Sequence, residues 1–107
     1  MTQVLLEDFK KLDLRIAKIL AVEEIPGADK LWKLSIDAGE PKTIVAGVKK
    51  FYPREALVGR SIVIVNNLAP AVIRGIESQG MLLAATEGEK LSLLMPDGGL
   101  APGSPVG

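Results

Sequence analysis

Within the segment 31–37, apolar and polar residues alternate strictly from Trp32 to Asp37, and this run favours a strand with one face in a core and the other in water. The apolar positions are Trp32, Leu34 and Ile36, and the polar ones are Lys33, Ser35 and Asp37. A period of two places every second side chain on the same face of an extended chain. The alternation therefore predicts a half-buried β-strand.

Several other segments have the length and composition of strands, and turn residues separate them. The segment 13–25 is long and apolar on both faces, so we expect it to bend and to serve two sides of a barrel. Further strands are predicted at 42–46, 61–66, 80–86 and 91–94, with turns at 26–29 and 38–41. A short amphipathic helix is predicted at 4–12, and a helical turn behind Pro53 at 51–57.

The order of these elements favours a small closed barrel. Strands and helices do not alternate along the chain, so a parallel sheet is not indicated. A length of 107 residues suffices for one hydrophobic core. Closing an antiparallel sheet removes its exposed edges. We predict an all-β, five-stranded antiparallel OB-fold barrel with a short helix between strands three and four. It forms one domain over 1–107, with a core at about 13–87 and small extensions at 1–12 and 88–107.

The chain lacks the residues that most enzymes use. It contains no Cys and no His, which excludes thiol chemistry and removes the commonest general base and metal ligand. Ser78 lies in Glu-Ser-Gln-Gly, which is not a nucleophile elbow. The adjacent Glu23 and Glu24 would point to opposite faces of a strand, so they form no acid-base pair. We predict a non-enzymatic protein without a cofactor or metal.

Charge is balanced over the chain but not along it. There are 13 basic and 13 acidic residues, so the net charge predicts no nucleic-acid partner. Between residues 41 and 60, however, five basic residues stand against Glu55 alone. Such a segment is either an ordinary solvated surface or a patch that attracts phosphate. No apolar run is long enough to span a bilayer, so we expect a cytoplasmic protein without a membrane partner.

Five basic residues are candidates for binding. In an OB barrel the ligand groove lies on the face of strands two and three, beside the loops joining strands one to two and four to five. The basic residues expected at these places are Lys30, Lys33, Lys49, Lys50 and Arg74. Lys33 taken alone is equally well explained as a solvent-facing strand residue.

The run from Gly75 to Ala85 is unusual for a plain loop and strand. Two glycines bracket a polar Ile-Glu-Ser-Gln, and Met81 begins an apolar stretch. Met81 is either core filler or a soft contact for a base or ribose beside Ser78. Trp32 and Tyr52 are too few for a base-stacking platform, which leaves recognition of a folded RNA by its phosphates and shape.

The chain resembles the tRNA-binding domain family. The similar stretches run in the expected order and cover nearly the whole sequence. They are Asp13-Leu14-Arg15-Ile16-Ala17-Lys18-Ile19, Pro26-Gly27-Ala28-Asp29-Lys30-Leu31, Thr43-Ile44-Val45-Ala46-Gly47, Leu68-Ala69-Pro70, Arg74 through Ala85, Leu94-Met95-Pro96-Asp97 and Pro102-Gly103. That family includes free-standing tRNA-binding proteins, the C-terminal domain or beta subunit of methionyl-tRNA synthetase, and CsaA-like proteins.

The resemblance implies an OB fold that binds the outer corner of tRNA by its shape. It implies tRNA contacts at Lys30, Ser78 and Met81, whereas Lys33, Lys49, Lys50 and Arg74 are added from their charge and expected place. It further implies a homodimer, for which we expect contacts from 5–12 and 91–106, and an aminoacyl-tRNA synthetase as a further partner. The turn 25–29 departs from the family's His-Pro-Asn-Ala-Asp and reads Ile-Pro-Gly-Ala-Asp.

Two functions follow as hypotheses. The first is a non-catalytic, structure-specific tRNA-binding module, free-standing or acting as a subunit or appended domain of methionyl-tRNA synthetase. The alternative is a CsaA-like chaperone or assembly module that binds polypeptide, with which the neutral net charge is compatible.

Overall fold

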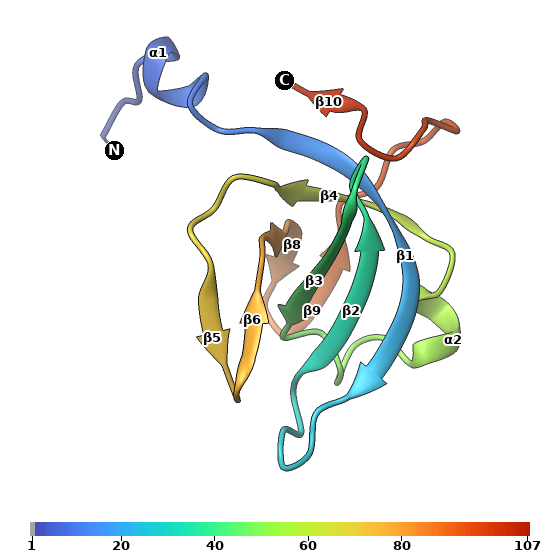
Figure 1. The fold of residues 1–107 in the computed structure, drawn as a ribbon. Helices are drawn as coiled ribbons and strands as arrows, with labels where there is room; N and C mark the ends of the chain where they lie inside the picture. Colours follow the sequence, from blue (N-terminus) through green and yellow to red (C-terminus); the bar gives the residue numbers. More distant parts are fainter. Residues whose placement is uncertain (1) are drawn as a thin grey trace.

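The fold consists of short antiparallel strands with two single-turn helices (Figure 1). It is known from a computed structural model, which describes residues 2–107. The elements are α1 (Leu6–Phe9), β1 (Leu14–Glu24), β2 (Trp32–Asp37), β3 (Pro41–Ala46), α2 (Arg54–Leu57), β4 (Ser61–Val65), β5 (Ala71–Ile73), β6 (Ile76–Ser78), β7 (Met81–Leu82), β8 (Ala84–Glu87), β9 (Lys90–Leu93) and β10 (Pro105–Val106).

One curled sheet forms the body of the molecule. Its strand order is β3-β2-β1-β4-β7, and β10 pairs with the start of β1. All these pairings are antiparallel, and α2 lies between β3 and β4 in the chain. The predicted all-β antiparallel barrel with a short helix between strands three and four is confirmed. Two hairpins, β5–β6 and β8–β9, are added to it.

The long strand β1 bends as predicted, and a bulge marks the place. Ile19 pairs with Ile36 and Ala21 pairs with Ser35, which leaves Leu20 as an extra residue. An extra residue exchanges the two faces of a strand. For this reason Ala17 and Ile19 are buried before the bulge and Val22 after it, while Leu20 is 51% exposed. One strand can therefore pair with β4 along its first half and with β2 along its second.

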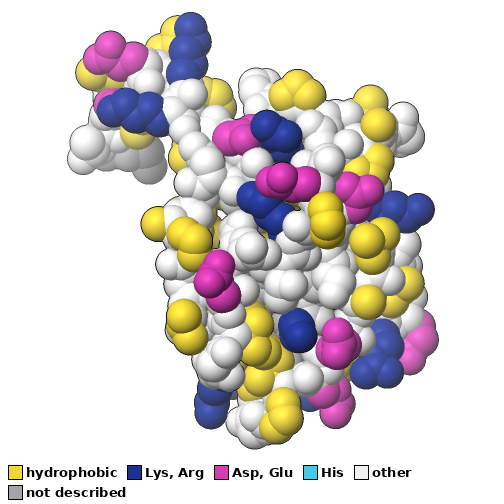
Figure 2. All heavy atoms as spheres, in the orientation of Figure 1, with side chains coloured by type: hydrophobic (Ala, Val, Ile, Leu, Met, Phe, Trp, Pro, Cys, Tyr) yellow, Lys and Arg dark blue, Asp and Glu magenta, His cyan; other side chains and the backbone are white. Residues whose placement is uncertain are grey.

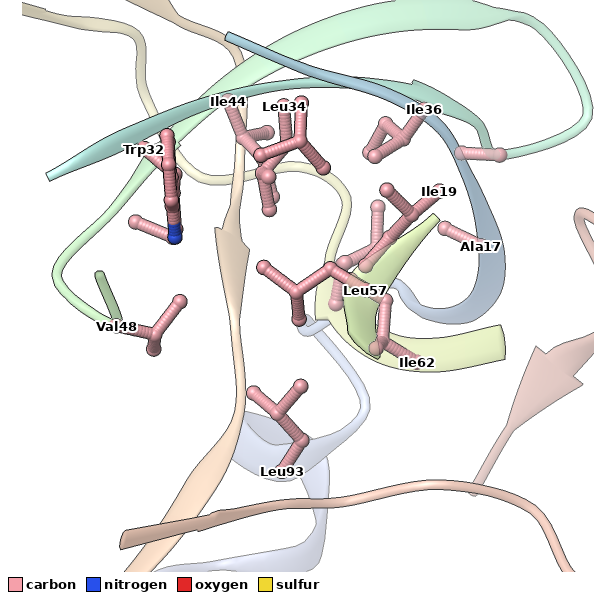
Figure 3. Packing of buried hydrophobic residues seen from close by; sticks show 14 residues of the cluster. Ala17, Ile19, Trp32, Leu34, Ile36, Ile44, Val48, Leu57, Ile62 and Leu93 are labelled. Atoms are coloured by element: carbon pink, nitrogen blue, oxygen red, sulfur yellow. The ribbon is translucent and has the colours of Figure 1, made fainter. Parts of the chain in front are cut away.

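The core fills the interior of the curled sheet (Figure 3). The apolar face of β2 is buried as its alternation predicts. Ile44 of β3 is paired with Leu34 and lies beside it on the same face (Figure 3). Leu57 of α2 and Ile62 of β4 pack into the same cluster, and Leu93 of β9 closes the far side (Figure 3). The C-terminal extension thus contributes to the core.

Two predictions about the segment 68–86 are wrong. The stretch before Gly80 is not a loop, because β5 and β6 form a hairpin there. The predicted strand 80–86 is broken at Leu83 into β7 and β8, which pair with different partners. Leu82 and Ala84 pack against the core, whereas Ala85, inside the predicted strand, is exposed.

The predicted N-terminal helix is present only as the single turn α1. None of its residues is buried, and the segment before β1 stands away from the barrel (Figures 1 and 2). Neither α1 nor α2, the helices found in residues 2–107, has the length and apolar character needed to cross a membrane.

Candidate nucleic-acid interface

Three loops meet at one end of the barrel, at the bottom of Figure 1. They are the β1–β2 turn, the β5–β6 turn and the exit from β3. Lys30 of the first loop and Arg74 of the second line the same surface depression of ≈380 Å³, together with residues 27–29 and Leu31. The structure thus brings together two of the predicted basic residues from positions 44 residues apart in the chain.

A small apolar cluster fixes the two loops against each other. Ile25 and Ala28 of the β1–β2 turn are buried against Val45 of β3. Ile73 and Ile76 of the β5–β6 hairpin and Leu31 pack onto this cluster. Ile25 stands where the family commonly has His, so an apolar anchor replaces a polar group at this turn. Gly27 has φ +77°, a conformation that both glycine and the family's Asn tolerate.

Arg74 lies at the tip of the hairpin in a strained backbone conformation. Its φ is +53°, and it is the sole non-glycine residue with positive φ among residues 2–107. Gly75, which follows, has φ +80°. Two positive φ values in succession are typical of tight turns that match the twist of a hairpin. Arg74 is exposed in this turn, and such strain often accompanies functional positions.

The two lysines after β3 lie in different surroundings. The Nζ atom of Lys49 is 4.9 Å from the centroid of the Trp32 ring and 3.4 Å from Oε1 of Glu24, and its side chain is only 24% exposed. Lys50 is exposed and lines a separate depression of ≈840 Å³ beside Phe51 and the β8–β9 hairpin. These lysines therefore do not share the depression of Lys30 and Arg74.

Arg54 was missed as a candidate residue. Its guanidinium carbon is 5.7 Å from the centroid of the Trp32 ring. The indole of Trp32, which is buried as predicted and donates a hydrogen bond to the carbonyl of Tyr52, thus lies close to two cations. The local excess of basic residues in the sequence was the available signal, but spacing alone does not place Arg54 near β2.

Lys33 lies on the outward face of β2, half-buried between neighbouring strands. It is paired in register with Glu23 of β1 and Val45 of β3. A base and an acid at directly opposite positions attract each other weakly at a surface. Lys33 therefore stands beside the site without lining the depression of Lys30 and Arg74.

Ser78 lies inside the protein and not on its surface. Its side chain is 5% exposed. The hydroxyl accepts a hydrogen bond from the amide of Val45 at 3.0 Å and donates one to the carbonyl of Gly80 at 3.1 Å. In this conformation the hydroxyl is already engaged and does not face a ligand.

Met81, in contrast, is 48% exposed, so it is not core filler. Its side chain borders an apolar depression of ≈200 Å³ lined by Val45, Leu68, residues 69 and 71, Ile73, Ser78 and Gly80. Gly80 is required next to it, because a Cβ atom there would lie 2.9 Å from the carbonyl oxygen of Val65. The exposed thioether and the apolar hollow form a surface suited to the flat face of a base or to a ribose.

The acidic and basic side chains are interspersed on the face seen in Figure 2 and do not form one basic field. Lys30, Lys50 and Arg74 form no ion pair within residues 2–107, whereas Lys49 pairs with Glu24. Residues 2–107 contain no group of three or more His, Cys, Asp or Glu side chains that could hold a metal ion. The arrangement is suited to a few separate phosphate contacts.

A small antiparallel barrel with a helix between β3 and β4 is the OB-fold class of all-β modules, whose ligands bind at the face of strands two and three and at the neighbouring loops. The chain belongs to the family described as "Putative tRNA binding domain", whose model matches residues 14–105. The chain is similar to methionine–tRNA ligases and to CsaA chaperones.

The methionine–tRNA ligase of Pyrococcus furiosus is 56% identical over 98 residues, which are 91% of this chain and 14% of that protein. The chain thus spans about a seventh of the length of such curated relatives. A MetRS-related protein from Pyrococcus horikoshii superposes with a TM-score of 0.93 at 35% identity and covers 99% of both chains. The chaperone CsaA of Bacillus anthracis gives a TM-score of 0.90 at 32% identity, over 99% of this chain and all of that one.

Proposed function

We propose that this chain is a non-catalytic module that binds tRNA by its three-dimensional shape, at the outer corner of the molecule. The observation that carries the proposal is the shared depression of Lys30 and Arg74, which two separate loops form at one end of the barrel. Membership of the tRNA-binding domain family supports it.

Lys30 and Arg74 are the phosphate contacts in this proposal, and Lys33 on β2 and Lys50 after β3 are further basic contacts outside their depression. Met81 supplies an apolar contact to a ribose or base. Phosphate contacts carry no sequence information by themselves. Two loops fixed against each other set the distance between their basic residues and so select for the spacing of phosphates in a folded RNA. Ser78 is not among the proposed contacts, because its hydroxyl is buried and engaged.

The proposed setting is the cytoplasm, where the module serves an aminoacyl-tRNA synthetase as a subunit or an appended domain. High identity to methionine–tRNA ligases supports this class of partner. The proposal includes a homodimer, in which the exposed apolar residues of segment 4–12 and of the C-terminal part contact a second copy. These residues are Val4, Leu5, Leu6, Phe9, Leu12, Leu94, Met95 and Leu100.

A gel-shift titration of bulk tRNA at several salt concentrations tests the tRNA proposal. Lys30→Ala and Arg74→Ala should each weaken binding about five- to tenfold and reduce the slope of log affinity against log salt by somewhat less than one. Lys18→Ala is the matched control, because Lys18 is also exposed but lies outside the loops that carry Lys30 and Arg74. It belongs to β1, where it is paired with residues of β2 and β4. Equal affinity for tRNA and for an RNA duplex of similar length would exclude recognition of the corner.

A second candidate function is binding of unfolded polypeptide, as in a chaperone. The apolar hollow beside Met81, with the exposed Leu68 and Val72 near it, favours this candidate together with the similarity to CsaA. A labelled unfolded protein should then bind in the presence of nuclease and be displaced by Met81→Asp. Retention that nuclease abolishes would leave tRNA as the ligand and reject the chaperone function.

A further inference from the structure

The outer edge of β3 is closed by side chains and not by a second strand. On its other edge β3 forms a regular ladder with β2. On the outer edge the amide of Thr43 donates to Oε1 of Gln79 at 2.9 Å, and the amide of Val45 donates to Oγ of Ser78 at 3.0 Å. The sole backbone bond in this arrangement runs from the amide of Gln79 to the carbonyl of Thr43, at 2.8 Å.

Buried amides need acceptors, so these two side chains are structurally necessary at this edge. Without Ser78 the amide of Val45, a residue that is 8% exposed, would lose its acceptor in a place that water does not reach easily. We call the pair Ser78 and Gln79, with their bonds to Thr43 and Val45, the β3 clasp.

The β3 clasp lies between two of the proposed contact residues. Ser78 ends β6, whose hairpin carries Arg74 four residues earlier in the chain. The Ser78 hydroxyl also holds the carbonyl of Gly80, directly before Met81 at the start of β7. One buried side chain therefore fixes the chain on the Arg74 side and on the Met81 side at the same time.

We propose that Ser78 and Gln79 are positioning residues for tRNA binding: they touch no RNA, and they hold Arg74 and Met81 in place by clasping the edge of β3. The part that these residues play in RNA binding rests on the proposed tRNA function. Their positioning of Arg74 and Met81 rests on the hydrogen bonds alone. It assigns to Ser78 a different part from the direct contact that the family resemblance implies.

The two roles of Ser78 give different salt dependences. A hydroxyl that touches RNA is uncharged, so its removal lowers affinity equally at every salt concentration. A hydroxyl that positions Arg74 removes a phosphate contact when it is lost, and each lost phosphate contact lowers the salt slope. The Ser78→Ala variant should therefore behave like Arg74→Ala, although no charge has been changed.

The experiment is a double-mutant cycle with tRNA. Affinity is measured at four salt concentrations for the wild type, Ser78→Ala, Arg74→Ala and the double variant. We expect Arg74→Ala to weaken binding about tenfold and Ser78→Ala at least as much, because it also releases Met81. The double change should weaken binding little more than Ser78→Ala, because the Arg74 contact is already lost. Fully additive losses, with an unchanged salt slope for Ser78→Ala, would overturn the proposal.

Three further variants keep the test informative. Ser78→Thr retains the hydroxyl and should restore both affinity and salt slope. Gln79→Ala removes the other half of the clasp and should lower the slope in the same direction, which serves if Ser78→Ala folds poorly. Ser61→Ala is the matched control, since Ser61 is half-buried on β4 and its side chain forms no hydrogen bond within residues 2–107.

Amide hydrogen exchange of the protein without RNA separates the clasp from the proposed function. Ser78→Ala should speed exchange at the Val45 amide. Exchange should stay unchanged at the amides that pair β1 with β4. If the wild type fails to prefer tRNA over duplex RNA, the tRNA function fails, yet faster exchange at Val45 would still support the clasp. Unchanged exchange at Val45 would overturn the clasp whatever the RNA result.

Discussion

Lys49 shows how the surroundings of one residue decide its part in binding. Its ammonium lies over Trp32 and beside Glu24, and its side chain is largely covered. A phosphate must compete with the Glu24 carboxylate for this charge. Lys49 is therefore a weaker candidate than Lys30 or Arg74, which form no ion pair within residues 2–107.

Glu24→Gln should raise tRNA affinity at low salt, because it removes the carboxylate that competes with phosphate for Lys49. The gain should be about two- to threefold, since only Glu24 of the pair is well exposed and salt screens the interaction. The gain should disappear at high salt. Gel-shift titrations of Glu24→Gln, Lys49→Ala and the double variant measure it. An equal gain in the Lys49→Ala background would point to a general charge effect and refute competition for Lys49.

At the opposite end of the barrel, Asp13 stabilises the start of β1. Its carboxylate accepts hydrogen bonds from Nε of Arg15 at 2.9 and 3.1 Å and from Nδ2 of Asn66 at 2.9 Å. The bonds from Arg15, followed by that from Asn66, lower the pKa of Asp13 below its usual value of 3.8, and burial opposes them.

A lowered pKa in the folded state means that the unfolded chain takes up the proton first. The contribution of Asp13 to stability is therefore fully present above the unfolded pKa, near 3.8, and is lost as the pH falls through the lower folded pKa. Denaturant midpoints measured from pH 6 to about pH 2 should fall less steeply for Asp13→Asn than for the wild type. Parallel curves would show that Asp13 does not contribute.

Residue chemistry in the sequence predicted some of these roles and missed others. Trp32 is in the core as its alternation indicates, and Lys30 and Arg74 meet as the OB arrangement predicts. The resemblance pointed to Ser78, but the sequence could not distinguish a buried hydroxyl from an exposed one, because the polar run 77–79 has no periodicity. Gln79 was not predicted as a candidate residue for the same reason.

At the scale of elements, long alternating runs were predictable and short irregular ones were not. β2 is recovered from its period of two. The bulge at Leu20 changes the parity of β1 in the middle of an apolar run, where both faces read alike. The β5–β6 hairpin has three-residue strands with an Arg at a positive-φ turn position, where Asn or Gly is the usual signal.

The junction between β6 and β7 depends on Gly80. A Cβ atom at this position would lie 2.9 Å from the backbone oxygen of Val65 and 3.6 Å from Cγ2 of Ile44. Backbone cannot move aside as a flexible side chain can, so Gly80→Ala should destabilise the protein by about 1–3 kcal/mol. Chemical denaturation measures this loss.

Gly98→Ala is the control for that measurement, because a Cβ atom at Gly98 meets nothing within 4 Å. It should change the free energy of unfolding by less than about 0.5 kcal/mol. If Gly80→Ala were equally harmless, the close approach of β7 to β4 would not be a constraint on the fold.

At the scale of the whole molecule, the apolar N-terminal segment is the feature that the barrel does not explain. Leu6 is 67% exposed and Phe9 is 42% exposed, and α1 buries none of its residues. Exposed apolar groups gathered on one segment are typical of an interface. A dimer formed through this segment would bring two copies of the proposed tRNA-binding loops to one RNA or to two, and would raise avidity.

The double substitution Leu6→Ser with Phe9→Ser should shift a dimer to monomers and leave the barrel folded, since neither side chain is part of the core. Size-exclusion chromatography with light scattering at several protein concentrations measures the mass. Leu20→Ser is the control, because Leu20 is an equally exposed apolar residue on the barrel itself. A wild type that stays monomeric at every concentration would refute the dimer.

The pairing of β1 with β10 places Leu14 opposite Val106, so the chain enters and leaves the barrel at neighbouring points. Both points lie at the top of Figure 1, and the loops with Lys30 and Arg74 lie at the bottom. A polypeptide linked to the barrel at either point would be attached at the end opposite these loops. The end of the barrel that carries Lys30 and Arg74 would then stay accessible.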